Sequence, residues 1–446
     1  MAEYVFQRKI YNEMLGWKNN LSDKYALLIK GARRVGKSTV AENFAKQEYK
    51  SYILIDFAHT SEDIKNLFRD ISDLDFFFLQ LQQLIGVRLY EHESVIIFDE
   101  VQLQPLARQA IKYLVADGRY DYIETGSLLT LKKNTVSILI PSEEHRLNMY
   151  PMDFEEFLWA VGDEITGETI KSVLASKKNF GNSLHRNLMR KFRLYMLVGG
   201  MPQAVVEYLE SNNLSSVDLV KREIINLYED DFTKIDASGF AGDIYDQIPS
   251  QLSSNASRYS VSKVKDTART SRAGKLLADM LSSYTVNIAY HANDPNVGMS
   301  LTKDSDKFKL FASDTGLFVT LAFKDKNYTE NIIYNKLLSD KLEANLGYVY
   351  ENVMAQMLVA KGYGLFYYTM RSETSNHLYE IDFLLSEGTK VSPIEVKSSK
   401  YKGHASLDKF VTKFSGRIQN KYVMHTKDYK RENGIDYLPV YTVPFI

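Results

Sequence analysis

The chain has 446 residues, of which 45% are hydrophobic and 25% are charged, and its formal net charge is -1. This length exceeds what one ordinary hydrophobic core fills, so two or three folded domains are expected. The balanced charge excludes bulk attraction of the whole molecule to nucleic acid, and any binding to phosphate must come from local patches. The absence of cysteine excludes disulfides, thiolate zinc sites, iron–sulfur clusters and a cysteine nucleophile.

The sequence has no feature of a membrane or secreted protein. No run of about 18 apolar residues occurs, as a membrane-spanning helix would require. The first 17 residues mix Glu3, Arg8, Lys9 and Glu13 with apolar residues, unlike a secretory h-region. The sequence therefore predicts a cytoplasmic protein without membrane contact.

A glycine-rich loop lies between a predicted strand and a predicted helix near the N-terminus. The apolar run 26–30 leads into Gly-Ala-Arg-Arg-Val-Gly-Lys-Ser-Thr, residues 31–39, and a helical pattern follows through Phe44. Glycines let backbone N–H groups surround phosphates, and the helix N-terminus adds partial positive charge. Lys37 is predicted to reach the β- and γ-phosphates of ATP, and the Ser38 hydroxyl to bind Mg²⁺.

A second apolar run, 94–98, ends in Asp99 and Glu100 and has the form of a buried parallel strand. Acids at strand ends often cap the next helix, but this pair follows a P-loop at a suitable distance. Asp99 is therefore predicted to hold the Mg²⁺ shell, and Glu100 to orient or deprotonate the attacking water.

Further strand patterns at 52–56 and 120–127 complete an alternating order of strands and helices, which predicts a doubly wound parallel sheet. Thr125 and Ser127 end the later strand, where a hydroxyl either senses the γ-phosphate or belongs to an ordinary turn. Arg146 precedes another strand-like run. It is either a solvated arginine or a residue that stabilises transition-state charge at a neighbouring subunit's ATP. The predicted nucleotide contacts are Gly31, Arg34, Val35, Gly36, Lys37, Ser38, Thr39 and Ser127.

Several motifs occur in a fixed order along nearly the whole chain. They are Arg8, the P-loop, Ile-Ile-Phe-Asp-Glu-Val-Gln ending at Gln102, Glu-Thr-Gly-Ser-Leu-Leu ending at Leu129, Arg146, Tyr-Pro-Met-Asp-Phe-Glu-Glu-Phe at 150–157, Tyr195, Gly-Gly-Met-Pro at 199–202, Phe-Ala-Ser-Asp-Thr-Gly-Leu at 311–317, Tyr-Glu-Asn at 350–352, Glu-Ile-Asp at 380–382 and Ile-Glu-Val-Lys at 394–397. On these motifs the chain resembles a prokaryotic group of AAA-type P-loop ATPases. Members of that group carry a winged-helix segment and a C-terminal domain of unknown function with the PD-(D/E)xK nuclease-like fold. Glu144 and His145 depart from the group, which usually has a glycine before the arginine.

The resemblance implies an α/β protein with four parts. These are a P-loop ATPase core with a parallel sheet at 1–150, a helical lid at 151–210, a winged helix-turn-helix segment at 211–330, and a restriction-endonuclease-like α/β domain at 331–446. Within the lid, the Gly-Gly-Met-Pro turn is interpreted as a sharp connection because glycine and proline usually punctuate structure.

The middle segment reads as short helices between Gln251 and Met280, followed by a predicted wing strand at 284–290. Six basic and two acidic residues give this segment a local net charge of +4. They are Arg258, Lys263, Lys265, Arg269, Arg272 and Lys275 against Asp266 and Asp279. A basic face suits contact with DNA phosphates, whereas winged helices also serve in protein docking, and both readings stay open.

The C-terminal third has the order of a nuclease-like core, with a helical stripe at 335–362, strands at 365–369, 378–385 and 391–396, and a helix at 407–414. Asp382 and Glu395 are predicted to bind Mg²⁺ jointly. Lys397 would position the attacking water, and Glu351 would complete the metal shell or orient that water. The bare pattern is common by chance, and the family resemblance is what singles out these residues.

Together these patterns predict an ATP-hydrolysing, Mg²⁺-dependent protein that couples its nucleotide state to DNA binding or cleavage. The alternative is a nucleotide switch or interaction protein whose C-terminal domain docks other proteins without cleaving. A head-to-tail homo-oligomer would place Arg146 at the next subunit's ATP, and a monomer would leave it idle.

Overall fold

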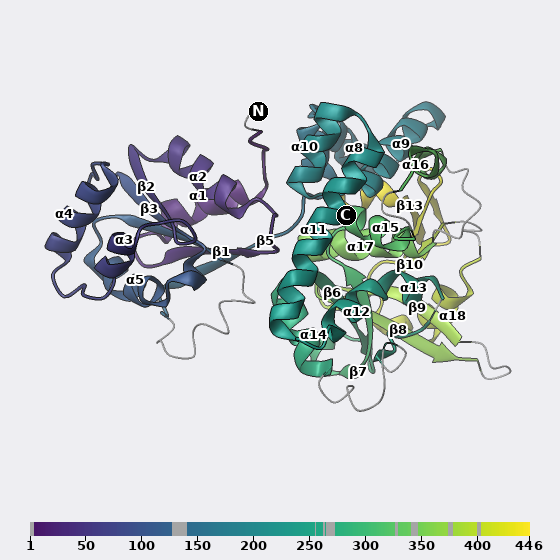
Figure 1. Ribbon diagram of the computed structural model, residues 1–446. Coiled ribbons are helices and arrows are strands. Elements are labelled where there is room, and N and C mark those ends of the chain that lie inside the picture. The colour runs from purple at the N-terminus through teal and green to yellow at the C-terminus, as the bar shows by residue number, and fades with distance from the viewer. Residues whose placement is uncertain are drawn as a thin grey trace. The chain divides into compact units, whose positions relative to one another are not determined.

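The computed structural model describes residues 4–126, 141–254, 256–261, 264, 273–325, 329–339, 347–372, 378–398 and 403–446. The chain divides into two compact units (Figure 1), one of residues 1–150 with 282–284 and one of residues 151–281 with 285–446. In the described part of the chain, no helix is long and apolar enough to cross a membrane.

The first unit alternates helices and strands around one sheet. Its elements are α1 (Ile10–Asn20), β1 (Ala26–Gly31), α2 (Lys37–Glu48), β2 (Ser51–Asp56), α3 (Glu62–Leu67), α4 (Leu74–Ile85), β3 (Ser94–Asp99), the 3-10 helix η1 (Val101–Leu103), α5 (Pro105–Asp117), β4 (Asp121–Gly126) and β5 (Glu144–Met149). All neighbouring strands are parallel, in the order β2-β3-β4-β1-β5. This arrangement confirms the predicted parallel α/β core.

Apolar side chains on both faces of this sheet explain its helical cover. One core cluster joins α1 and α2 to the sheet through residues such as Trp17, Phe44 and Ile29. A second cluster joins α4 and α5 to the opposite faces of the same strands, with Phe78, Leu114 and Ile96 among its members. Because both faces are covered, the strands are nearly continuous apolar runs, as the sequence predicted for β1 and β3.

The second unit begins with helices and ends with strands. Its elements are α7 (Phe154–Ala160), α8 (Ile165–Ser176), α9 (Asn182–Val198), α10 (Pro202–Ser211), α11 (Leu214–Ile235), α12 (Phe240–Asp246), α13 (Ile248–Ser253), α14 (Ala273–Ser282), β6 (Val286–Ala292), η4 (Met299–Leu301), β7 (Lys303–Ala312), α15 (Thr315–Ala322), α16 (Asn331–Leu338), α17 (Gly347–Ala360), β8 (Leu365–Arg371), β9 (Leu378–Glu387), β10 (Lys390–Lys397), α18 (Ala405–Lys413), η5 (Ser415–Arg417), β11 (Tyr422–His425), β12 (Lys430–Glu432), β13 (Ile435–Pro439) and η6 (Val440–Phe445).

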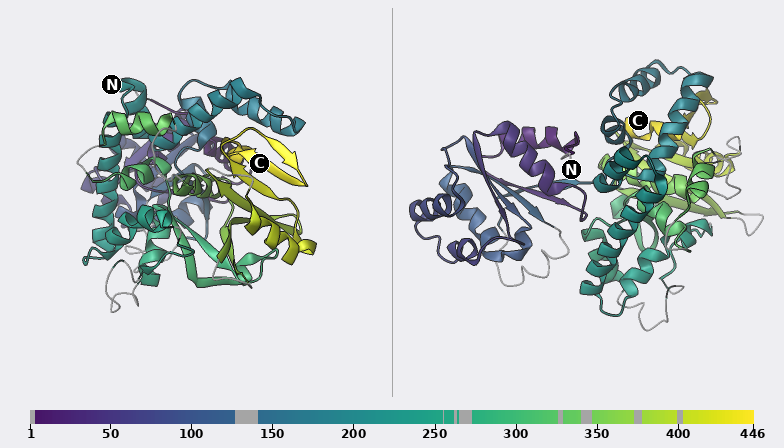
Figure 2. Two further views of the ribbon diagram at one scale, coloured as in Figure 1. Left: turned by 90° about the vertical axis from the view of Figure 1, so that its right-hand side faces the viewer. Right: turned by 45° about the horizontal axis from the view of Figure 1, so that its top comes forward.

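The strands of this unit form a single mixed sheet in the order β12-β13-β11-β10-β9-β8-β6-β7. Figure 2 shows the yellow C-terminal strands at one edge of it. β8, β9, β10 and α18 confirm the strands and helix predicted near the C-terminus. The predicted wing strand forms β6, which pairs with β7 and with β8 inside the large sheet. Most of the basic residues assigned to the winged helix lie outside the described residues, so the winged helix itself stays a prediction.

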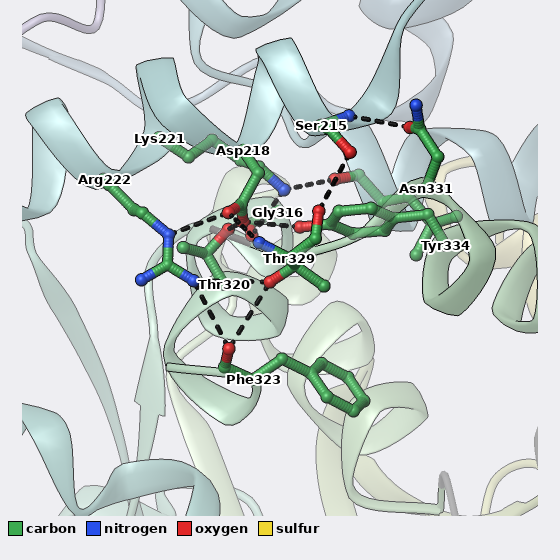
Figure 3. A network of polar contacts seen from close by, with 11 residues as sticks. Ser215, Asp218, Lys221, Arg222, Gly316, Thr320, Phe323, Thr329, Asn331 and Tyr334 are labelled. Atoms are coloured by element: carbon green, nitrogen blue, oxygen red, sulfur yellow. Dashed lines mark hydrogen bonds and ion pairs between the residues drawn. The ribbon is translucent and has the colours of Figure 1, made fainter. Parts of the chain in front are cut away.

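A buried polar network ties distant helices of the second unit together (Figure 3). The Asp218 carboxylate of α11 accepts hydrogen bonds from Thr320 Oγ1 at 2.9 Å, Tyr334 OH at 2.6 Å and the Thr329 amide at 2.9 Å. Arg222 Nε completes its shell at 2.7 Å. Charged groups are buried at low cost when they are paired and hydrogen-bonded, so this carboxylate fixes α11, α15 and α16 against each other.

The Gly-Gly-Met-Pro motif lies between α9 and α10, where it contacts two other motifs. Asp314 Oδ2 accepts the Gly200 amide at 2.6 Å, and the Gly200 carbonyl accepts the Met152 amide at 2.8 Å. A Cβ atom on Gly200 would overlap the Met152 backbone, so only glycine fits. Gly200 therefore joins the segments of chain that precede α7, α10 and α15.

Gly200→Ala should lower the free energy of unfolding of the second unit by about 2 kcal/mol, because the backbone must move to admit the methyl group. Denaturant titration followed by circular dichroism measures this loss. Gly242→Ala in α12 is the matched control, since a Cβ there meets nothing within 4 Å. Equal midpoints for the two variants would contradict this account of Gly200.

Candidate functional site

The P-loop of the first unit joins β1 to α2. Gly36, the residue before α2, has φ 99°, and Arg34 has φ 67°. Two residues of the loop therefore adopt left-handed backbone conformations before the helix starts. Successive backbone conformations of this kind direct N–H groups into one concave surface, which is how P-loops cradle phosphates. Val35 is buried beneath the loop, while Arg34 and Thr39 are exposed.

Lys37 is buried and folded back onto the loop. Its Nζ donates to the carbonyls of Gly31 at 3.2 Å and Ala32 at 3.0 Å. Burial lowers the pKa of Lys37, against the opposing effect of Glu100 and Asp99. Phosphate oxygens are stronger partners for an ammonium group than neutral carbonyls are, so a bound nucleotide would draw Lys37 out of these contacts.

Arg8 supports the loop through hydrogen bonds to two backbone carbonyls. Its guanidinium donates to the Val35 carbonyl at 3.0 Å and to the Tyr150 carbonyl at 2.6 Å. Both contacts lie inside the first unit, and Arg8 is buried. Arg8 therefore links the P-loop to the chain that follows β5, a role that the sequence motif alone did not reveal.

Ser38 and Asp99 converge from different elements. Ser38 Oγ, in the first turn of α2, donates to Asp99 Oδ1 at 2.7 Å at the end of β3. Thr125 Oγ1, from the end of β4, donates to the same carboxylate oxygen. Hydroxyl and carboxylate oxygens are the ligands that Mg²⁺ takes in nucleotide sites, so Ser38 and Asp99 fit the predicted metal position.

Glu100 follows Asp99 in a left-handed conformation, with φ 52°. Its amide donates to Thr125 Oγ1 at 3.3 Å, and its carboxylate accepts a hydrogen bond from Gln102 Nε2. Thr125 thus contacts both acids, and Gln102 fixes the direction of the Glu100 side chain. The sequence singled out Gln102 as part of a motif but predicted no contact for it.

Arg146 lies within β5 and is held by a neighbour on the same strand. Its side chain is 50% exposed, and NH2 contacts Glu144 Oε2 at 3.1 Å. Arg108 from α5 also binds Glu144, with its Nε at 2.8 Å and NH2 at 3.0 Å. The fully buried Glu124 lies in the same group, and burial raises the pKa of its carboxyl, to which Glu144 adds. Ser127 lies outside the described residues.

The residues predicted for a C-terminal nuclease site lie on three elements of the second unit. Glu351 is on α17, Asp382 on β9, and Glu395 with Lys397 on β10. Asp382 Oδ2 accepts the Val396 amide at 2.7 Å, whereas Glu395 Oε1 binds Lys397 Nζ at 2.6 Å. The other Glu395 oxygen is buried without a hydrogen-bond partner among the described residues.

A lysine outside the predicted motifs lies among these acids. Lys309 Nζ from β7 contacts Glu380 on β9, and it lies 3.4 Å from Glu351 Oε2. Burial alone would lower the pKa of Lys309, but Glu351, Glu380 and Asp382 outweigh burial and raise it. Burial raises the pKa of the Asp382 carboxyl well above its usual range, with a further contribution from Glu351.

Asp382 and Glu395 lie on the paired strands β9 and β10, and each has a protein partner. Asp382 accepts the Val396 amide, while Glu395 is engaged with Lys397. Over the described ranges, no group of three or more His, Cys, Asp or Glu side chains is placed to hold a metal ion. A Mg²⁺ ion shared by Asp382 and Glu395 therefore stays a prediction.

Comparison with known proteins gives family matches for three segments of the chain. Residues 23–158 match a family described as an AAA domain. Residues 189–328 and 346–443 match two families described as domains of unknown function, DUF8612 and DUF4143. No curated protein matches the chain. The first unit is thus a P-loop ATPase domain, by its family match and by the arrangement of its loop.

Solved structures show weaker similarity. A Walker-type ATPase of Pyrococcus abyssi is 17% identical, covering 72% of this chain and 97% of that chain with a TM-score of 0.43. A second structure is a Signal Transduction ATPase with Numerous Domains protein from Pyrococcus horikoshii, which has a tetratricopeptide repeat sensor. It is 12% identical, and the match covers 81% of this chain and 46% of that chain with a TM-score of 0.29. Cdc6p from Pyrobaculum aerophilum is 12% identical, and the match covers 77% of this chain and 98% of that chain with a TM-score of 0.26.

Proposed function

We propose that the first unit binds ATP with Mg²⁺ and hydrolyses it. The observation that carries this proposal is the convergence of Ser38 Oγ and Asp99 Oδ1, at 2.7 Å, beside the left-handed turn that opens α2. Two oxygen ligands and a phosphate-binding loop are thereby brought to the same end of β1 and β3, the carboxyl edge where parallel sheets bind ligands.

Each residue of the site has a separate role in this proposal. Lys37 exchanges its two carbonyl partners for the β- and γ-phosphates, and the loop amides hold the phosphate oxygens. Ser38 and Asp99 would hold Mg²⁺, which would neutralise phosphate charge when bound. Glu100, held by Gln102, orients the attacking water and accepts its proton. Thr125 supports this pair by donating to the Asp99 carboxylate and accepting the Glu100 backbone amide.

Lys37→Ala and Glu100→Gln should separate nucleotide binding from hydrolysis. Lys37→Ala should abolish tight ATP binding, because the phosphates lose their main cationic partner. Glu100→Gln should still bind ATP while phosphate release falls about 100-fold or more, because the amide cannot accept a proton. Steady-state phosphate release and a fluorescent ATP analogue measure the two effects. A Glu100→Gln protein with wild-type turnover would refute the assigned base.

We infer that the nucleotide state controls what the second unit binds. Nucleic acid is the first candidate partner, because the segment 258–279 carries a local net charge of +4. A protein partner is the second candidate, and it requires no cleavage by the C-terminal strands. The engagement of Lys309 with Glu351 and Glu380 favours binding over metal-assisted cleavage. A head-to-tail homo-oligomer with Arg146 acting in trans also stays a prediction.

Stimulation of phosphate release by DNA would distinguish these partners. If nucleic acid is the partner, the ATPase rate should rise with DNA concentration, and the stimulation should weaken as salt rises, because phosphate contacts release counterions. Replacing Arg258 and Lys275 together by Gln should weaken the stimulation, whereas replacing the exposed Lys112 and Lys178, which lie outside this segment, should not. A rate that is independent of single- and double-stranded DNA would favour a protein partner.

A further inference from the structure

Lys309 is a buried lysine enclosed by acids from two separate elements. Its side chain is 5% exposed, and it contacts Glu380 on β9 and Glu351 on α17. The ring of Tyr367, on β8, lies 5.6 Å from its Nζ. A buried ammonium requires paired charge and hydrogen bonds, and these two carboxylates supply both. Lys309 is therefore built into the site and is not a surface lysine that happens to lie nearby.

The remaining acids of this region have protein partners of their own. Asp382 Oδ2 accepts the Val396 amide at 2.7 Å, and Glu395 Oε1 is paired with Lys397 at 2.6 Å. A Mg²⁺ ion demands near-octahedral oxygen geometry at short distances, so its carboxylate ligands must turn toward one point. Here Lys309 engages Glu351 and Glu380, Lys397 engages Glu395, and one Asp382 oxygen accepts the Val396 amide. The one Glu395 oxygen without a hydrogen-bond partner among the described residues cannot form a metal shell alone.

We propose that Lys309 is the resident cation of the acidic site formed by Glu351, Glu380 and Asp382, and that this site takes no divalent metal. The ammonium group neutralises part of the carboxylate charge that Mg²⁺ would otherwise balance. This acidic site then supplies no metal ion with which to polarise a phosphodiester. This inference concerns the second unit alone and holds whether or not the first unit hydrolyses ATP.

The test is titration of the full-length, nucleotide-free protein with Mn²⁺, followed by electron paramagnetic resonance of free Mn²⁺. Wild type, Asp382→Asn and Glu395→Gln should bind the same amount of Mn²⁺. Lys309→Met should gain one Mn²⁺ per chain, bound at least tenfold more tightly than any Mn²⁺ on the wild type. The gain should disappear in Lys309→Met combined with Asp382→Asn.

Lys324→Met is the matched control. Lys324 also bridges two carboxylates, with Nζ 2.7 Å from Glu229 and 3.1 Å from Asp246, but its side chain is 39% exposed. Its removal should create no Mn²⁺ site. A wild-type Mn²⁺ site that Asp382→Asn or Glu395→Gln removes would overturn the proposal, and so would a folded Lys309→Met protein that gains no Mn²⁺. If Lys309→Met does not fold, the comparison of wild type with Asp382→Asn decides.

Discussion

The nucleotide site depends on the hydrogen bonds that the Asp99 carboxylate accepts. One of its oxygens accepts hydrogen bonds from Ser38 on α2 and from Thr125 on β4, so three segments of the first unit meet at a single atom. The parallel sheet makes this possible, because β1, β3 and β4 are neighbours that end at the same edge. The same hydroxyl that bonds Asp99 is the group expected to bind Mg²⁺, so the two proposed metal ligands lie in direct contact.

Several motifs that the sequence singled out in the second unit contact one another inside it. Gly200 and Asp314 join the chain before α10 to the chain before α15, and Tyr195 OH donates to the Met152 carbonyl at 2.8 Å. Gln356 on α17 then donates to Tyr195 OH at 2.9 Å and accepts from the Thr315 amide at 2.8 Å. Motifs that are far apart in sequence thus form one buried polar network.

The sequence predicted the first unit well because its signals are local. A strand, a glycine loop and a helix occupy consecutive residues, and the acids follow directly on an apolar run, so Lys37, Ser38, Asp99 and Glu100 could be assigned without knowledge of the fold. Lys309 could not, because its partners lie on α17 and β9, which are far from β7 in sequence and are brought to Lys309 only by the fold. The sequence offered one sign of this site, a lysine within the apolar end of β7. The neighbouring residues do not show whether that lysine faces inward or outward.

Exchanging the proposed metal ligand of the P-loop is the most direct test of the central claim that Ser38 binds Mg²⁺ during ATP hydrolysis. The chain has no cysteine, so Ser38→Cys introduces its one thiol. Thiolates favour soft cations over Mg²⁺, so phosphate release by Ser38→Cys should collapse in Mg²⁺ and recover in Cd²⁺ relative to wild type in the same metals. An unchanged rate in Mg²⁺, or a loss that Cd²⁺ does not restore, would contradict this assignment.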